Sequence, residues 1–133
     1  MNVFTLHLQS ATQYERIDDV ASFVGRDASG SFGLLARHAR FMTALVFGLA
    51  WFRTAQGNRQ YLALPGGLVY FNGNQLYVNT RRYLRGPDYE LLRTALGKQF
   101  AMEERELQTM KQSLRNLEQE MLKRLVKMQR ERP

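Results

Sequence analysis

The amino-terminal part of the chain, up to about Arg85, has the pattern of short strands separated by turns. Apolar and polar residues alternate from Val3 to Gln9, which is typical of a half-buried strand. The runs Leu68–Phe71 and Leu76–Thr80 flank an Asn-Gly dipeptide, which supplies the positive φ angles of a tight hairpin turn. Turn residues recur at intervals of roughly 8–12 residues, a spacing typical of an all-β sandwich or flattened barrel.

Other stretches of this part are less regular. Val20–Val24 predicts a second short strand, and the Asp18-Asp19 pair before it predicts a turn. Gly25–Ser31 is rich in turn residues and predicts a loop. Phe41–Val46 and Leu49–Arg53 predict two further strands that a glycine separates.

The pattern changes to that of a helix at Gly86-Pro87-Asp88. Proline is tolerated in the first turn of a helix, and the acidic Asp88 and Glu90 suit its positive end. Residues 87–106 carry three basic and five acidic groups, whereas residues 120–133 carry five basic and two acidic groups, which matches the helix dipole at both ends. Apolar residues recur every three or four positions and form one stripe, close to a heptad seam: Leu107, Met110, Leu114, Leu117, Met121, Leu125 and Met128.

This segment fits either one long helix or a hairpin of two helices. A single helix over residues 88–130 would be about 64 Å long, too long to lie on a domain of the preceding size. Gly97 is a weak break, and Ala101–Glu104 contains no turn residue. We therefore divide the chain into a β-sandwich domain at residues 1–86 and a helical segment at residues 87–133.

Charge narrows the possible partners. The 133 residues carry a net charge of +7, which favours an acidic partner such as nucleic acid, an anionic membrane surface or an acidic protein face. The excess of positive charge is spread along the chain, because residues 1–86 carry nine basic and four acidic groups and residues 87–133 carry ten and eight.

The longest apolar run, Phe41–Phe52, is too short to span a membrane as a helix, and Met1–His7 lacks the features of a signal peptide. We expect a soluble or peripheral protein.

Few residues suggest chemistry. There is no cysteine, and no carboxylates at ligand spacing accompany His7 or His38, so we expect no metal site; we interpret His7 as a surface residue. Gly25–Gly33 lacks the ending of a P-loop, and no serine lies in a nucleophile elbow. The basic cluster Arg81–Arg85, with an aromatic inside it, fits a surface that binds single-stranded nucleic acid or an edge strand guarded by charge.

Three segments resemble one known family. They are Gly30–Ala39 (GSFGLLARHA), Phe41–Leu45 (FMTAL) with Gly48 after it, and Leu64–Val69 (LPGGLV). They resemble motifs of the epsilon subunit of rotary F-type ATP synthases. The resemblance to that subunit covers nearly the whole chain. Ala36-Arg37 and Arg40 stand where the family usually has Pro-Gly and Pro. With residues 27–33 and 80–84, these departures resemble the epsilon-like subunit of the alternate, N-type bacterial ATPases.

The resemblance implies a sandwich of about ten short antiparallel strands followed by helices. It implies a non-catalytic central-stalk subunit, peripheral at the cytoplasmic face of the bacterial inner membrane, that couples rotation of the c-ring to catalysis. Its helices would either fold on the sandwich or extend along the stalk and restrain ATP hydrolysis. The only full match to the family's ATP-binding motif in Tyr89–Thr94 is Arg93, so we expect no cofactor. The membrane would be met only indirectly, and no nucleic acid is expected.

The resemblance also assigns partner-binding residues. Those that would lie toward the c-ring are Ser29, Gly30, Ser31 and Phe32. Those that would lie toward the gamma subunit are His38, Ala39, Arg40, Phe41 and Met42. Those that would face acidic segments of the beta subunits when the helices extend are Lys123, Arg124, Lys127 and Arg130, because opposite charges attract.

Overall fold

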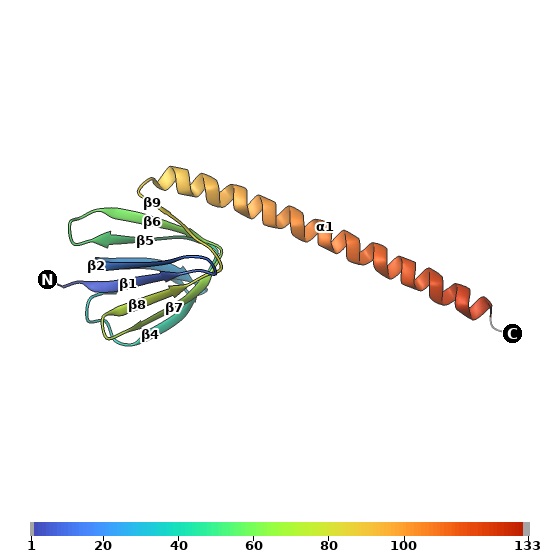
Figure 1. Ribbon diagram of the computed structural model, residues 1–133, viewed down its shortest axis with the longest axis horizontal. Coiled ribbons are helices and arrows are strands. Elements are labelled where there is room, and N and C mark those ends of the chain that lie inside the picture. The colour runs from blue at the N-terminus through green and yellow to red at the C-terminus, as the bar shows by residue number, and fades with distance from the viewer. Residues whose placement is uncertain (1, 132–133) are drawn as a thin grey trace. The chain divides into compact units, whose positions relative to one another are not determined.

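The computed structural model describes residues 2–131 and contains nine strands and one helix in that range (Figure 1). In chain order these are β1 (Phe4–Gln9), β2 (Tyr14–Asp27), β3 (Gly30–Leu35), β4 (Phe41–Leu45), β5 (Gly48–Thr54), β6 (Arg59–Leu64), β7 (Gly67–Asn72), β8 (Gln75–Asn79), β9 (Leu84–Gly86) and α1 (Tyr89–Arg130). The predicted class, a β sandwich followed by a helical segment, is confirmed. The strands number nine within the described residues, where about ten were expected.

The strands form one continuous hydrogen-bonded path with open ends, and its inward side chains form the core. Its order is β4-β7-β8-β1-β2-β5-β6-β9, with β3 paired to β2. The strands pair antiparallel as expected, except that β1 and β8 run parallel, with Leu6 opposite Leu76. A long connection separates these two strands in the chain, and that permits the parallel pairing.

The strand β2 is much longer than the sequence predicted. It covers 14 residues and pairs with β1, β3 and β5, so the predicted turn at Asp18-Asp19 was wrong, and the loop expected at Gly25–Ser31 shrinks to a turn at Ala28-Ser29. The sequence pattern does not predict the first half of β2 as a strand, because its outward residues are charged and only Ile17 and Val20 contribute apolar surface to the core. The residue Gly25 does not turn the chain. It lies in the strand opposite Phe32, and the position takes a glycine because a Cβ there would meet Phe32 and Leu45 side-chain atoms at 2.8 and 2.9 Å.

The hairpin of β7 and β8 is confirmed. Asn72 pairs with Gln75, so the central pair of the turn is Gly73-Asn74 rather than Asn72-Gly73. Both central residues have positive φ, 57° at Gly73 and 59° at Asn74, as a type I′ turn requires.

The core of the sandwich is aromatic and aliphatic. Phe4, Phe23, Phe52 and Phe71 are at most 2% exposed, and Phe4 meets Phe71 edge to face at 5.3 Å. Such large buried rings contribute the greater part of the hydrophobic stabilisation of a domain this small.

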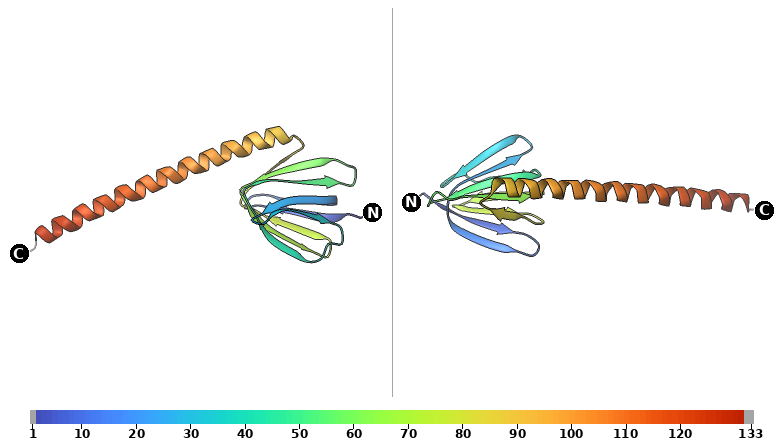
Figure 2. Two further views of the ribbon diagram at one scale, coloured as in Figure 1. Left: turned by 180° about the vertical axis from the view of Figure 1, so that it is seen from behind. Right: turned by 90° about the horizontal axis from the view of Figure 1, so that it is seen from above.

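The helix α1 runs without a break from Tyr89 to Arg130, so of the two alternatives the structure has one long helix (Figure 2). Asp88 caps its start, since the Leu91 N–H donates to Asp88 Oδ1 at 3.2 Å. The helix continues through Gly97, where nothing crowds the position of a Cβ. The chain divides into two compact units between Leu96 and Gly97, so the first turns of α1 belong to the sandwich unit.

Candidate partner-binding surfaces

The turn between β2 and β3 is held by the carboxylate of Asp27. Oδ1 accepts hydrogen bonds from the Ser29 hydroxyl at 2.6 Å and the Ser29 N–H at 2.9 Å, and Oδ2 accepts one from the Thr43 hydroxyl at 2.8 Å. The bond from the Ser29 hydroxyl, followed by that from Thr43, lowers the pKa of Asp27. The turn is thereby tied to β4, and Ser29 and Ser31 are left exposed.

Phe32 points from this turn toward the core. It is half-buried and packs against Phe23 and Phe41, with ring centroids 6.4 and 5.2 Å away. Of the four residues expected to face the c-ring, the exposed ones are the two serines, while Phe32 supports the turn from beneath.

The segment after β3 is anchored to the β7–β8 turn. Arg37 adopts a φ of 69°, a left-handed value that favours glycine, and its N–H donates to Asn74 Oδ1 at 2.6 Å. His38 Nδ1 donates to the Ala39 carbonyl at 2.8 Å, and its ring meets the edges of Phe41 and Phe71. His38 is therefore a positioned surface residue.

The outer face of β4, β7 and β8 is unusually apolar. Met42 is 70% exposed and lies opposite Tyr70, while Ala44 lies opposite Leu68, which is 58% exposed. Directly opposed residues project to the same side of a sheet, so these side chains form one surface. Contiguous exposed apolar surface is a common feature of interaction sites, which makes this face a candidate. The sequence signal was the run Leu68–Phe71, which is apolar on both faces of its strand.

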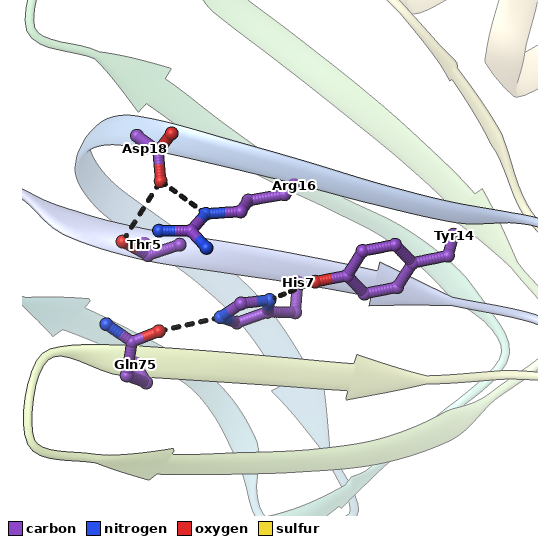
Figure 3. A network of polar contacts seen from close by, with 6 residues as sticks. All are labelled: Thr5, His7, Tyr14, Arg16, Asp18 and Gln75. Carbon is purple, nitrogen blue, oxygen red and sulfur yellow. Dashed lines mark hydrogen bonds and ion pairs between the residues drawn. The ribbon is translucent and has the colours of Figure 1, made fainter.

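An aromatic row continues this face across β8 and β1. The ring of His7 stacks on Tyr77 at 4.6 Å, and Tyr77 stacks on Tyr70 at 6.2 Å. His7 Nε2 donates to Gln75 Oε1 at 2.7 Å, because an amide oxygen can only accept, and Nδ1 accepts from the Tyr14 hydroxyl at 2.6 Å (Figure 3).

The interpretation of His7 as a plain surface residue was wrong, since it is 8% exposed. It lies on the central strand β1 and is covered by Tyr14 and Tyr77, which are seven and seventy residues away in the chain. Beside it, Arg16 donates to Asp18 at 2.7 Å, and this hydrogen bond lowers the pKa of Asp18.

The basic cluster Arg81–Arg85 is built into the fold. Tyr83 is 7% exposed and donates to Glu15 Oε1 at 2.7 Å, and Arg85 donates to Glu15 Oε2 at 2.6 Å. Burial, followed by the bond to Glu15, raises the pKa of Tyr83 to about 12. With its ring buried, Tyr83 cannot stack on a base, and Leu84–Gly86 is an edge strand, as the charge-guarded alternative predicted.

The helix unit presents its basic residues on an exposed surface. Lys123, Lys127 and Arg130 line one shallow groove together with Leu122 and Val126. Lys127 also lies 4.0 Å from Glu131 on the same helix.

Residues 4–86 match the family model of the ATP synthase delta/epsilon chain, beta-sandwich domain. The chain belongs to this family.

Relatives and solved structures agree with the family. The protein named ATP synthase epsilon chain 2 from Cereibacter sphaeroides is 34% identical over 83 residues, which cover 62% of this chain and 57% of that relative. This chain therefore spans less than two thirds of the length of that relative. A chain of the Euglena gracilis mitochondrial ATP synthase (OSCP/F1/c-ring) matches with a TM-score of 0.59 at 23% identity, covering 75% of this chain and 64% of that one. A chain of the Tetrahymena thermophila mitochondrial ATP synthase (central stalk/c-ring) matches with a TM-score of 0.52 at 13% identity, covering 60% and 64%. These two structures bear on the fold alone.

The delta/epsilon sandwich exposes most, but not all, of the residues expected to face the gamma subunit. His38, Ala39 and Arg40 are exposed beside the half-buried Phe41, and Met42 belongs to the apolar outer face. No cluster of three His, Asp or Glu residues that could hold a metal occurs in residues 2–131. Within that range, α1 is not apolar enough to cross a membrane.

Proposed function

We propose that this chain is the epsilon-type central-stalk subunit of a rotary ATP synthase and has no active site of its own. The family match over residues 4–86 and the name of the relative support this role. In this role the sandwich at residues 1–86 binds the gamma subunit and the c-ring, and residues 87–133 form a regulatory segment. The subunit couples ring rotation to catalysis in other chains.

The apolar outer face of β4, β7 and β8 carries the proposal for the gamma subunit. Met42 and Leu68 are more than half exposed, and Tyr70 and Tyr77 lie beside them. A methionine among aromatic side chains suits the buried centre of an interface. His38, Ala39 and Arg40, which are exposed in the segment just before β4, are proposed to contact the gamma subunit as well.

The turn at Ser29–Phe32 is proposed to lie toward the c-ring. The serines Ser29 and Ser31 offer hydroxyls, and Asp27 keeps the backbone of the turn fixed. A fixed polar turn can hydrogen-bond to loops of another protein without a large loss of conformational freedom.

The basic end of α1 is proposed to face acidic segments of the beta subunits in an extended state, and so to restrain ATP hydrolysis. The residues concerned are Lys123, Arg124, Lys127 and Arg130, all of which are exposed. Because long-range attraction between exposed charges is screened by salt, this restraint should weaken as ionic strength rises.

The proposed location is the cytoplasmic face of the bacterial inner membrane, with the membrane met only through the c-ring. The relative's designation as chain 2 and the departures at Ala36, Arg37 and Arg40 support assignment to the alternate, N-type enzyme.

A binding experiment with the gamma subunit encoded beside this chain tests the proposal. The tagged chain should capture gamma in a stoichiometric complex, and Met42→Glu should weaken the complex by about tenfold or more, because it buries an unpaired charge. Leu84→Glu is the matched control, since Leu84 is a 53% exposed leucine on the edge strand β9. Failure of the folded chain to bind gamma would overturn the proposal, and equal losses in both variants would remove the assigned surface.

A further inference from the structure

The apolar side chains of α1 form a heptad stripe that is exposed in the structure. In heptad notation, Leu107, Leu114, Met121 and Met128 occupy a positions, and Met110 and Leu117 occupy d positions. Their exposed fractions run from 46% at Leu107 to 65% at Met128. A stripe of this period buries itself best against another helix with the same period.

The charges that flank the stripe indicate the direction of that second helix. In the same notation, Glu106 and Lys127 lie at g positions, and Lys111 and Glu118 lie at e positions. In a parallel pair the g flank of one helix faces the e flank of the other. If one helix is reversed, g faces g and e faces e, because each flank then meets its own counterpart.

In an antiparallel pair of two copies, there is one register in which every flank contact between two charged residues is attractive. With Leu114 opposite Leu117 of the second copy, Lys111 faces Glu118 and Glu106 faces Lys127. The two-fold symmetry repeats both contacts, which gives four attractive pairs. The remaining facing pairs between positions 104 and 127 are Glu104 with Leu125 and Glu120 with Ser113, so no like charges meet.

The same register accommodates the two charged residues within the stripe. Arg124 lies opposite Leu107, and Glu103 lies opposite Met128, near the ends of the paired segment where long side chains reach water. In a parallel pair, Arg124 would face Arg124 of the second copy and Glu103 would face Glu103, which places like charges together in the core. The antiparallel direction is therefore favoured.

We propose that the free chain pairs with a second copy of itself through an antiparallel coiled coil over residues 103–128 of α1. This segment is about 39 Å long and removes the leucine and methionine stripe from water. The proposal does not depend on the proposed stalk function. Any other protein that docks on the same stripe must displace the second copy.

Sedimentation equilibrium of the full chain tests the pairing. Between about 1 and 100 μM, a range that spans micromolar affinity, the mass should rise from 15.5 kDa toward twice that value. Glu118→Lys should weaken the dimer by about tenfold, because it places a lysine opposite Lys111 of the second copy. All the residues changed are exposed on the helix, and circular dichroism checks that helix content is unaltered.

A charge exchange separates the two directions. Lys111→Glu combined with Glu118→Lys restores the antiparallel pair and should return the dimer to the affinity of the unmodified chain. In a parallel dimer, the glutamate at position 111 would face Glu106 and the exchange would weaken binding.

Crosslinking gives an independent measure of direction, since the chain has no cysteine. When chains with Leu107→Cys and chains with Arg124→Cys are mixed and oxidised, the antiparallel dimer should form crosslinks between unlike variants. Crosslinks between like variants would overturn the proposed direction. A monomer at every concentration, or a dimer that Glu118→Lys leaves unchanged, would overturn the pairing.

Discussion

The sandwich and the distal part of α1 hold their structures in opposite ways. In the sandwich, residues far apart in the chain bury each other: Phe4 packs on Phe71, and Glu15 bonds to Tyr83 and Arg85. In residues 97–130 the leucines and methionines of the helix are exposed, and side-chain contacts such as Gln112 to Asn116 join residues one turn apart. The sandwich unit thus contains its own source of stability, whereas the helix unit depends on what covers its stripe.

The largest expected effect on stability comes from comparing a buried apolar residue of the sandwich with an exposed apolar residue of α1. Phe71→Ala should destabilise the sandwich by about 3–5 kcal/mol, because it removes a fully buried ring from a packed core. Leu114→Ala should change stability by less than about 0.5 kcal/mol in dilute protein, because Leu114 is 55% exposed and alanine favours the helix.

Urea unfolding followed by the fluorescence of Trp51, the single tryptophan, measures the free energy of unfolding of the sandwich. A large loss of that free energy in Leu114→Ala would contradict the independence of the two units.

A smaller effect is expected from the same substitution at two glycines. Gly67→Ala should destabilise the sandwich by roughly 1–3 kcal/mol, because its Cβ would lie 2.5 Å from the Asn79 carbonyl oxygen and the backbone must move. Gly97→Ala meets no neighbouring atom and should stabilise the helix by roughly 1 kcal/mol. Thermal unfolding of the sandwich and helix content by circular dichroism measure the two effects separately. If both substitutions destabilise, a contact at Gly97 that the structure does not contain is required.

How much could be predicted from sequence also differs between the two regions. The heptad stripe and the acidic residues Asp88 and Glu90 are local features, and the helix that they predict is present, although spacing alone did not decide between one helix and two. The β7–β8 hairpin was predicted for the same reason, since its turn chemistry is local.

Two errors in the sandwich, at Gly25 and at His7, concern long-range packing. Gly25 looked like a turn residue because the close approach of Phe32 and Leu45 cannot be read from its neighbours in the chain. His7 looked exposed because Gln75 and Tyr77, which cover it, lie on a strand that pairs in parallel from far away. Of the candidate surface, Met42 was predicted from the family resemblance, whereas Leu68, Tyr70 and Tyr77 join it only once the strands are in register.

The smallest expected effect concerns ion pairs, and it compares a partly buried pair of the sandwich with an exposed pair on the first turn of α1. Burial raises the pKa of Glu15, but the hydrogen bonds from Tyr83 and Arg85 outweigh it, so the pKa is lowered from 4.5. A group with a lowered pKa stabilises the fold above its unfolded pKa, and this contribution is lost as pH falls through the folded value. Stability of the sandwich should therefore fall in the acid range below about pH 4.5.

Glu15→Gln should cost about 1 kcal/mol at neutral pH and flatten the acid limb of the stability curve, measured by urea unfolding across pH. Glu90→Gln is the matched control, because Glu90 lies 3.9 Å from Arg93 in a pair that is mostly exposed. An exposed pair of that kind contributes little, so the control should leave both the stability and its pH dependence unchanged. An acid limb that survives in Glu15→Gln would assign the loss to other carboxylates, of which Asp27, tied to Ser29 and Thr43, is the next to substitute.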